Sequence, residues 1–274
     1  MLFDDTRRFV ADMIGHRELV RSLTAKEFKV RYKNAVLGFL WTILNPLLLM
    51  VVLTLVFRFF FQPRWEYTEK YPFPAFLLCG LIPWTFMAHS LSRCTSSLVD
   101  NAPLIQKVYF PREIIPLSSI LANLLNLLLS LVVLFFFLFL MDQMPSVWIL
   151  AVPLIVFAEL VFVVGICLAT SSLHVFYRDV AYIVEVALLV WWWGTPIFYP
   201  HQLVQNAPAV SPLLYRIYMA NPMAAIVVAF RQILLERRFP DGDLVGTLFV
   251  VAFLSFFIGL AIFRKKQAVV ADFV

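Results

Sequence analysis

Six long apolar stretches run through this 274-residue sequence, and they limit what it can fold into more than any other feature. They lie at residues 35–61, 74–98, 114–140, 146–172, 180–198 and 244–263. A helix needs roughly 20 apolar residues to cross the hydrocarbon core of a bilayer. Inside lipid every backbone polar group must be paired within the protein, and these stretches lack the alternation of a membrane β-barrel. We therefore predict an all-α, polytopic membrane protein with six transmembrane helices.

The composition agrees with a chain whose main solvent is lipid. Hydrophobic residues make up 62% of it and charged residues 14%, whereas soluble domains carry about 25% charge. The net charge of +5 is typical of cytoplasmic segments facing anionic lipid, so we do not expect nucleic acid as a partner. Cys79, Cys94 and Cys167 each lie within an apolar stretch, which argues against disulfides and a zinc site. A cleaved signal peptide is not expected from the first ~30 residues, which are polar and charged.

The distribution of Lys and Arg predicts the orientation. A cytoplasmic N-terminus places 14 of the 22 Lys and Arg residues on the cytoplasmic side, and six on the other, four of them in one long connection. Both termini are therefore predicted to be cytoplasmic. The organisation that follows is an N-terminal region at 1–34, a transmembrane domain at 35–263 and a cytoplasmic tail at 264–274.

The first 33 residues are predicted to form two helices. Residues 2–14 place their apolar side chains within about 140° of one another, which is typical of a helix lying in the membrane interface. Residues 16–33 have helical propensity and two apolar faces, one with Leu19, Val20, Leu23 and Val30 and another with Phe28 and Tyr32. The alternative is a solvated basic tail.

The connection at 199–243 is too long for a turn and too apolar for a disordered loop. Asn221-Pro222 divides its apolar part, 213–235, into halves that are each too short to cross. We predict two half-helices that enter from the outer side and return. Two further full spans are the alternative, and they would place Arg216 and Arg231 in lipid.

Several kinds of chemistry are absent from the sequence. No Gly-x-x-x-x-Gly-Lys-Ser/Thr phosphate loop occurs, so this chain is not expected to hydrolyse ATP. Its four histidines have no metal-ligand spacing, and no metal site is expected. Within the spans only Glu159 and Glu185 are acidic. Each could be functional or structural, and a proton-coupled carrier usually needs more intramembrane carboxylates.

The segment at 100–113 carries its own helix signals. Asp100 or Asn101 could cap it, Pro103 would occupy the first turn, and Pro111 would stop it after Lys107. A short helix on the membrane surface is something a soluble partner could push on. Aromatic residues are dense at 191–199; they are typical of an interfacial belt, or of a path along which sugar rings stack.

A set of motifs then occurs in order along the chain and resembles one family. The motifs are KVRYK at 29–33, VLGFLW at 36–41, LNP at 44–46, GLIPW at 80–84, KVYFPRE at 107–113, VFYRD at 175–179, TPIFYP at 195–200 and NPM at 221–223. They resemble the permease subunit of type-2 ABC exporters for O-antigen, capsular polysaccharide or wall teichoic acid. The resemblance implies a homodimer in the bacterial cytoplasmic membrane, two copies of a separate ATPase that binds ATP and Mg²⁺, and a lipid-linked polymer as cargo. No cofactor is implied for this chain itself.

The resemblance also implies roles for individual residues. The segment that couples to the ATPase would include Asn101, Pro103, Leu104, Lys107, Tyr109, Arg112 and Glu113, with the apolar side chains of Leu104 and Tyr109 inserted into a cleft of the partner. The N-terminal gate would include Phe28, Arg31 and Tyr32. From the aromatic residues themselves, and not from the resemblance, we predict that the polymer path includes rings from among Trp41, Trp191, Trp192, Trp193, Phe198 and Tyr199. Helical geometry prevents all three consecutive tryptophans from facing one pore. Competing possibilities are an exporter of another lipid or small molecule, a secondary transporter with internal repeats, and a membrane enzyme.

Overall fold

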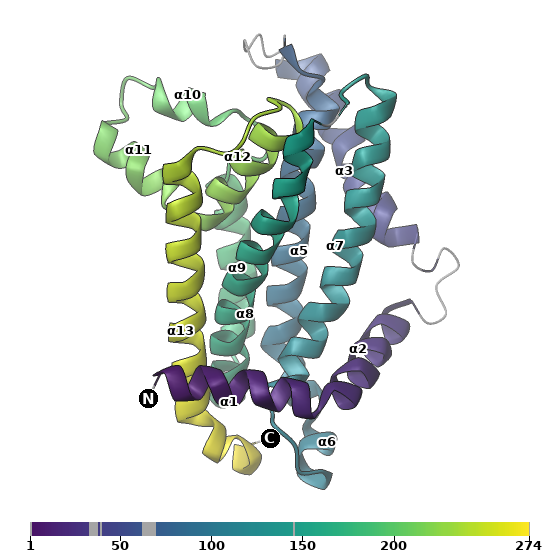
Figure 1. Ribbon diagram of the computed structural model, residues 1–274, viewed down its shortest axis with the longest axis vertical. Coiled ribbons are helices and arrows are strands. Elements are labelled where there is room, and N and C mark those ends of the chain that lie inside the picture. The colour runs from purple at the N-terminus through teal and green to yellow at the C-terminus, as the bar shows by residue number, and fades with distance from the viewer. Residues whose placement is uncertain (1, 33–37, 39, 62–69, 145, 274) are drawn as a thin grey trace.

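The computed structural model describes residues 2–32, 38, 40–61, 70–144 and 146–273. Most of these residues are helical, and no strand occurs among them, which confirms the all-α prediction. Figure 1 shows a bundle whose chain passes repeatedly between two ends. Both termini lie at the end that also holds α1, α2 and α6.

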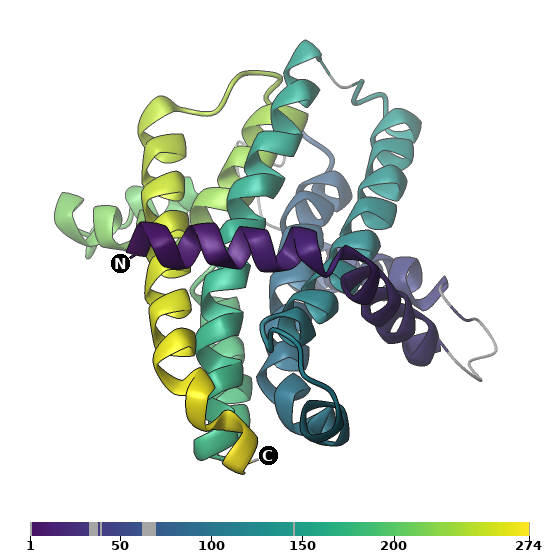
Figure 2. The same cartoon turned by 60° about the horizontal axis from the view of Figure 1, so that its bottom comes forward.

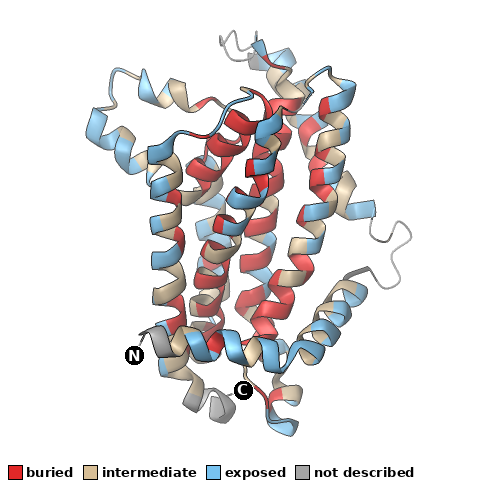
Figure 3. Ribbon diagram, in the orientation of Figure 1, coloured by how far each residue is buried: buried red, intermediate tan, exposed pale blue. Residues whose placement is uncertain are grey.

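Among the described residues, five elements are long and apolar enough to cross a membrane. They are α3 (Leu40–Val56) continued by the π-helix η1 (Phe57–Phe61), α5 (Phe73–Asp100), α7 (Ile114–Leu140), the 3-10 turn η2 (Val147–Ala151) continued by α8 (Val152–Phe176), and α13 (Gly242–Phe273). Their degree of burial differs widely, as Figure 3 shows. The most apolar window of α5 is 78% buried inside the protein, whereas that of α3 is 11% buried. The helix α5 is therefore the centre of the bundle, and α3 lies at its edge.

The sixth predicted span is shorter than expected. The helix α9 (Val180–Trp193) has 14 residues and rises about 21 Å, against a hydrocarbon core of about 30 Å. The prediction that it continues to Phe198 is wrong. Gly194 ends the helix, and Pro196 lacks an amide proton and disfavours helical geometry at Thr195. The chain from Thr195 to Tyr199 continues from α9 as irregular backbone.

The predicted half-helices are present. α11 (Pro212–Met219) and α12 (Pro222–Leu234) meet at an angle of 85°. The side chain of Asn221 caps α12 by accepting a hydrogen bond of 3.0 Å from the amide of Met223. Both halves and α10 (His201–Gln205) lie at the end of the bundle opposite α6 (Figure 1). Because α13 begins at that same end, this arrangement matches a segment that enters and returns, as predicted from Asn221-Pro222.

The helices α8 and α13 share the most extensive contact in the bundle. Gly165 on α8 and Gly259 on α13 meet backbone to backbone, and a Cβ added to either would approach the other helix to well under 3.0 Å. The hydroxyl of Ser255, one turn before Gly259, donates to the carbonyl of Phe162 over 3.1 Å. Small residues four apart are the usual means by which membrane helices approach closely.

The N-terminal region forms two helices that pack on the bundle. α1 (Leu2–Gly15) crosses α13 (Figure 2), and the ring of Phe9 meets Phe256 edge-on at 5.6 Å. Val10 and Ile14 remain exposed, as an interfacial helix requires. α2 (Arg17–Tyr32) packs mainly against α7, using the predicted face of Leu19, Val20 and Leu23. Val30, predicted for the same face, is exposed instead. The alternative of a solvated tail is not supported.

Candidate functional sites at the helical segment after α5 and in the membrane

The predicted surface helix is present as α6 (Ala102–Lys107), directly after α5. Its expected cap is wrong: no side chain caps α6, and Ser96 donates to the carboxylate of Asp100. The Asn101 amide oxygen instead accepts a hydrogen bond from the ammonium of Lys26 on α2, over 3.1 Å. Its amide nitrogen donates to the carbonyl of Ser97 over 2.9 Å. Asn101 thus joins the start of α6 to the N-terminal region.

The side chains around α6 divide into an inner and an outer set. Leu104 and Ile105 pack towards the bundle core. Pro103 and Lys107 are exposed, and Tyr109, just after the helix, is fully exposed. Of the two apolar side chains predicted to enter a partner, Tyr109 is fully exposed and Leu104 is partly buried against the core. Leu104 faces inward because one side of so short a helix must cover the ends of its neighbours.

A buried polar cluster follows α6. Glu113 has no exposed surface, and its carboxylate pairs with Arg264 on α13 at 3.0 Å. The side chain of Gln267 donates to Glu113 over 3.2 Å, and Arg112 donates to the backbone carbonyl of Gln267. Burial raises the pKa of Glu113, and the positive charge of Arg264 opposes this shift. Arg264 also lies 3.5 Å from Asp12 on α1.

This cluster connects three segments that are far apart in sequence, namely α1, the α6–α7 connection and the end of α13. A cavity of about 690 Å³ lies between the same three segments. Its wall includes Asp5, Arg8, His16 and Tyr109 as well as members of the cluster. Arg112 and Glu113 were predicted from the sequence, but Asp12, Arg264 and Gln267 were not, because no local pattern links residues that lie 154 and 252 positions apart.

The predicted gate residues lie at the end of α2. Phe28 is partly buried within this helix. Arg31 and Tyr32 form its last turn, and their side chains lie outside the described part of the structure.

The predicted aromatic residues fall into separate groups. Trp191 and Trp192 pack inward against Trp84 of α5, with ring centroids 6.3 and 5.5 Å away. The indole of Trp191 donates to the Asn221 side chain over 2.7 Å. These two rings therefore anchor α9 and the start of α12 to the centre of the bundle. The expectation that the three consecutive tryptophans face different surroundings is confirmed.

A second group lies beyond α9. Trp193 is 63% exposed, and its ring meets Phe198 at 5.2 Å. The Tyr199 hydroxyl donates to the carbonyl of Trp193 over 3.1 Å, and Phe57 of η1 contacts Phe198 at 5.7 Å. Trp41 lies 16 residues before Phe57 and thus about 24 Å away along α3. A single chain does not bring all six predicted rings together.

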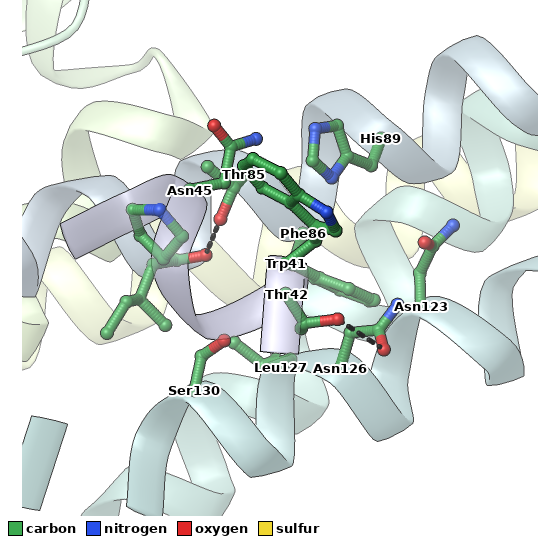
Figure 4. Close-up of a pocket in the computed structure, with 12 residues that line it drawn as sticks. Trp41, Thr42, Asn45, Thr85, Phe86, His89, Asn123, Asn126, Leu127 and Ser130 are labelled. Atoms are coloured by element: carbon green, nitrogen blue, oxygen red, sulfur yellow. Dashed lines mark hydrogen bonds between the residues drawn. The ribbon is translucent and has the colours of Figure 1, made fainter. Parts of the chain in front are cut away.

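Trp41 instead borders a polar pocket of about 290 Å³ between α3, α5 and α7 (Figure 4). Hydrogen-bonding side chains come from all three helices, namely Thr42, Asn45, Thr85, His89, Asn123, Asn126 and Ser130. The hydroxyl of Thr42 donates to Asn126 over 3.4 Å. On α5, His89 is 11 residues from Asp100 and 16 from Phe73, about 16 and 24 Å respectively. The pocket is therefore inside the membrane-spanning region.

The pocket was not predicted from the sequence, although α7 carries a signal for it. Asn123, Asn126 and Ser130 are spaced three and four apart, and so share one face of an otherwise apolar helix. Each residue alone is unremarkable in a span. Only the approach of α3 and α5 makes the stripe one wall of a pocket.

The two intramembrane carboxylates lie elsewhere. Glu159 on α8 has no exposed surface, and neither of its carboxyl oxygens has a hydrogen-bond partner among the described residues. Glu185 is exposed on α9. The three cysteines are buried and free, and the described part of the chain contains no cluster of three metal-ligating side chains.

Comparison with known proteins gives a consistent result. The sequence profile of the ABC-2 type transporter family matches residues 18–235. The chain is 31% identical over 266 residues to the O-antigen export system permease protein RfbA of Myxococcus xanthus, covering 97% of this chain and 98% of that protein. It is 30% identical to an RfbA of Klebsiella pneumoniae, with 91% and 92% covered. It is 23% identical to the polysialic acid transport protein KpsM of Escherichia coli, with 90% and 93% covered.

Proposed function

Because the chain belongs to the ABC-2 type transporter family, we propose that it is the transmembrane subunit of an exporter for lipid-linked cell-surface polysaccharide in the bacterial cytoplasmic membrane. The observation that carries this proposal is the match to O-antigen export permeases across 97% of the chain. Relatives named for polysaccharide transport favour a glycan over wall teichoic acid as cargo. A secondary transporter is not favoured.

The second part of the proposal is a separate ATPase, present in two copies, that binds ATP and Mg²⁺ and drives export. The exposed side chains around α6 support it. Pro103, Lys107 and Tyr109 project from the end of the bundle, where a soluble subunit could dock. The cluster of Arg112 and Glu113 would pass motion of α6 to the base of α13 through the contacts with Arg264 and Gln267.

The third part is a homodimer with both termini in the cytoplasm. The exposed apolar side chains on α3 and α9, including Val52 and Val186, could face either lipid or a second copy of the chain. The Lys and Arg distribution supports the orientation. Phe28, Arg31 and Tyr32 would then lie at the cytoplasmic entrance, while Trp193, Phe198 and Tyr199 would lie towards the exit.

Deletion of the gene tests the function directly. The deletion strain should lose surface polysaccharide and accumulate the lipid-linked polymer inside the cell, and the wild-type gene should restore export. The purified chain should hydrolyse no ATP, and should gain hydrolysis only together with its cognate ATPase. Normal surface polysaccharide in the deletion strain would refute the proposed cargo. ATP hydrolysis by the contaminant-free chain would refute the proposal that a separate subunit hydrolyses ATP.

A further inference from the structure

We propose that the pocket between α3, α5 and α7 binds a single uncharged sugar ring of the exported polymer. The proposal rests on the function proposed above and adds a site and a ligand chemistry to it. Four observations carry it: the polarity of the pocket, its depth, its size, and the position of Trp41 at its edge.

The polarity of the pocket indicates a neutral ligand rich in hydroxyl groups. The amides of Asn45, Asn123 and Asn126 can each donate and accept hydrogen bonds, and hydroxyls of Thr42 and Ser130 add to them. No Lys, Arg, Asp or Glu is among the described residues that line the pocket. A phosphate or carboxylate would call for cationic partners, whereas sugar hydroxyls are matched by amides and hydroxyls.

The depth of the pocket makes a merely structural role expensive. Polar side chains inside a span are costly, and they usually face a cavity or a functional path. About 290 Å³ stays open between the three helices, beside these polar side chains. The contact from Thr42 to Asn126 is long at 3.4 Å, and the Thr85 hydroxyl is satisfied by the carbonyl of Ile82 on its own helix. A cavity this polar holds water when no ligand is bound.

The size of the pocket limits how much of a polymer it can hold. Ligand pockets for drug-sized molecules are about 300–1,000 Å³, so this one is at the lower limit. It suits one ring rather than an oligosaccharide. A chain moving through the membrane would then occupy it one unit at a time.

Trp41 supplies an aromatic face at the edge of the pocket (Figure 4). The face of an aromatic ring is electron-rich and attracts the C–H groups of a sugar ring. Trp41 is 48% exposed, and Asn45, one turn further along α3, is also exposed. The helix α3 is the least buried of the five long spans. The pocket is therefore accessible from the edge of the bundle, beside α3.

Photo-crosslinking in cells tests the proposal. A benzoyl-phenylalanine at position 41 should form an adduct with the polymer, detected with a polymer-specific lectin. The matched control is position 148, because Trp148 is similarly exposed, at 42%, but lies on η2 outside the pocket. Absence of an adduct at 41, an equal yield at 148, or persistence in a strain that cannot make the polymer would overturn the proposal.

Substitutions in the pocket provide a second measurement. Asn126→Leu and Ser130→Ala should each lower the export rate about two- to tenfold, the loss expected for one hydrogen bond. Asn126→Gln should recover part of the rate. The control on the same helix is Ser118→Ala, since the buried Ser118 hydroxyl donates only to Ile114 of its own helix. It should export normally.

These results separate the pocket from the function as a whole. Membrane levels and thermal stability of each variant identify misfolding, and the polymer adduct is scored per molecule of folded protein. Asn126→Leu and Ser130→Ala are also made in the protein that carries the crosslinker at position 41. If wild-type protein restores export in the deletion strain, and both variants export and crosslink at wild-type rates, the sugar site is refuted and the proposed function stands. If wild-type protein itself restores nothing, the proposed function fails.

Discussion

The buried Arg231 on α12 offers a sharp test of how the irregular backbone after α9 is held inside the bundle. Its side chain is 2% exposed. The guanidinium donates to the carbonyls of Pro196 and Ile197, each over 2.6 Å, and to the carbonyl of Phe76 over 3.3 Å. It also lies 3.4 Å from the centre of the Phe76 ring. One fork-shaped cation thereby joins α12, α5 and the segment after α9.

Replacing Arg231 by Met keeps the length of the side chain and removes every donor. Leaving the carbonyls of Pro196 and Ile197 without a donor costs about 1–3 kcal/mol each, and losing the cation over the Phe76 ring costs about 2 kcal/mol more, whereas the Phe76 carbonyl itself lies within the helix α5. Removing the buried charge also removes its desolvation penalty, which stabilises the folded protein by several kcal/mol. We expect a net loss of about 2–4 kcal/mol in the free energy of unfolding. Arg231→Lys should lose less, because an ammonium retains the charge but cannot reach all three carbonyls in fixed directions.

Denaturant unfolding of the purified protein in micelles measures this loss. The matched control is Arg216→Met, since Arg216 lies on the neighbouring α11 and is exposed. It should change stability by no more than about 0.5 kcal/mol. If Arg231→Met is also within that range, the guanidinium does not hold the segment and our account of it is wrong.

Three further predictions address other parts of the molecule. Gly259→Leu should disrupt the contact between α8 and α13 and lower the free energy of unfolding by more than the ~1–3 kcal/mol typical of an overpacked core. The control is Gly246→Ala, because Gly246 is exposed and has open space around its Cβ position. Equal thermal stability of the two variants would contradict this prediction. Tyr109→Glu should abolish the stimulation of the partner ATPase by this chain while membrane insertion stays normal, and Lys107→Ala should have a smaller effect. Normal stimulation by the Tyr109→Glu variant would show that this surface does not contact the ATPase. Burial, and then the charge of Arg231, lower the pKa of His201 from 6.5 to about 4. The unfolded chain therefore takes up the proton at a higher pH than the folded protein, and the free energy of unfolding should fall by at most roughly 3 kcal/mol as the pH drops from about 6.5 to about 4. His201→Gln should flatten this part of the stability profile, and an unchanged slope would show that another group is responsible.

Much of the fold follows from local patterns in the sequence. The long spans are visible because lipid demands about 20 apolar residues for each crossing. The half-helices follow from one dipeptide, Asn221-Pro222, and the N-terminal helix from its apolar stripe. The end of α9 at Gly194 was misplaced because apolarity continues to Phe198 while helical geometry does not. Hydropathy detects the solvent around a segment and not its backbone conformation.

The candidate sites were less predictable. Pro103, Lys107 and Tyr109 could be found because the α6 helix signals are local. The inward position of Leu104 depends on what α6 covers, and the pairing of Glu113 with Arg264 joins residues that only the folded bundle brings together. The pocket likewise depends on three helices. A sequence shows which residues are unusual for their surroundings, but the partners of Trp41 and Asn126 come from the packing of α3 against α5 and α7.

The glycine contact between α8 and α13 has a mechanical consequence. Two helices whose backbones touch at Gly165 and Gly259 have no layer of side chains that could shear between them. We expect them to behave as one stiff beam. Glu113 and Arg264 attach the base of this beam to the segment that follows α6, so a push there would tilt the whole beam. The helix α3 is the least buried of the long spans and is held by few neighbours. We therefore expect α3 to move when the bundle widens to admit a large transported molecule.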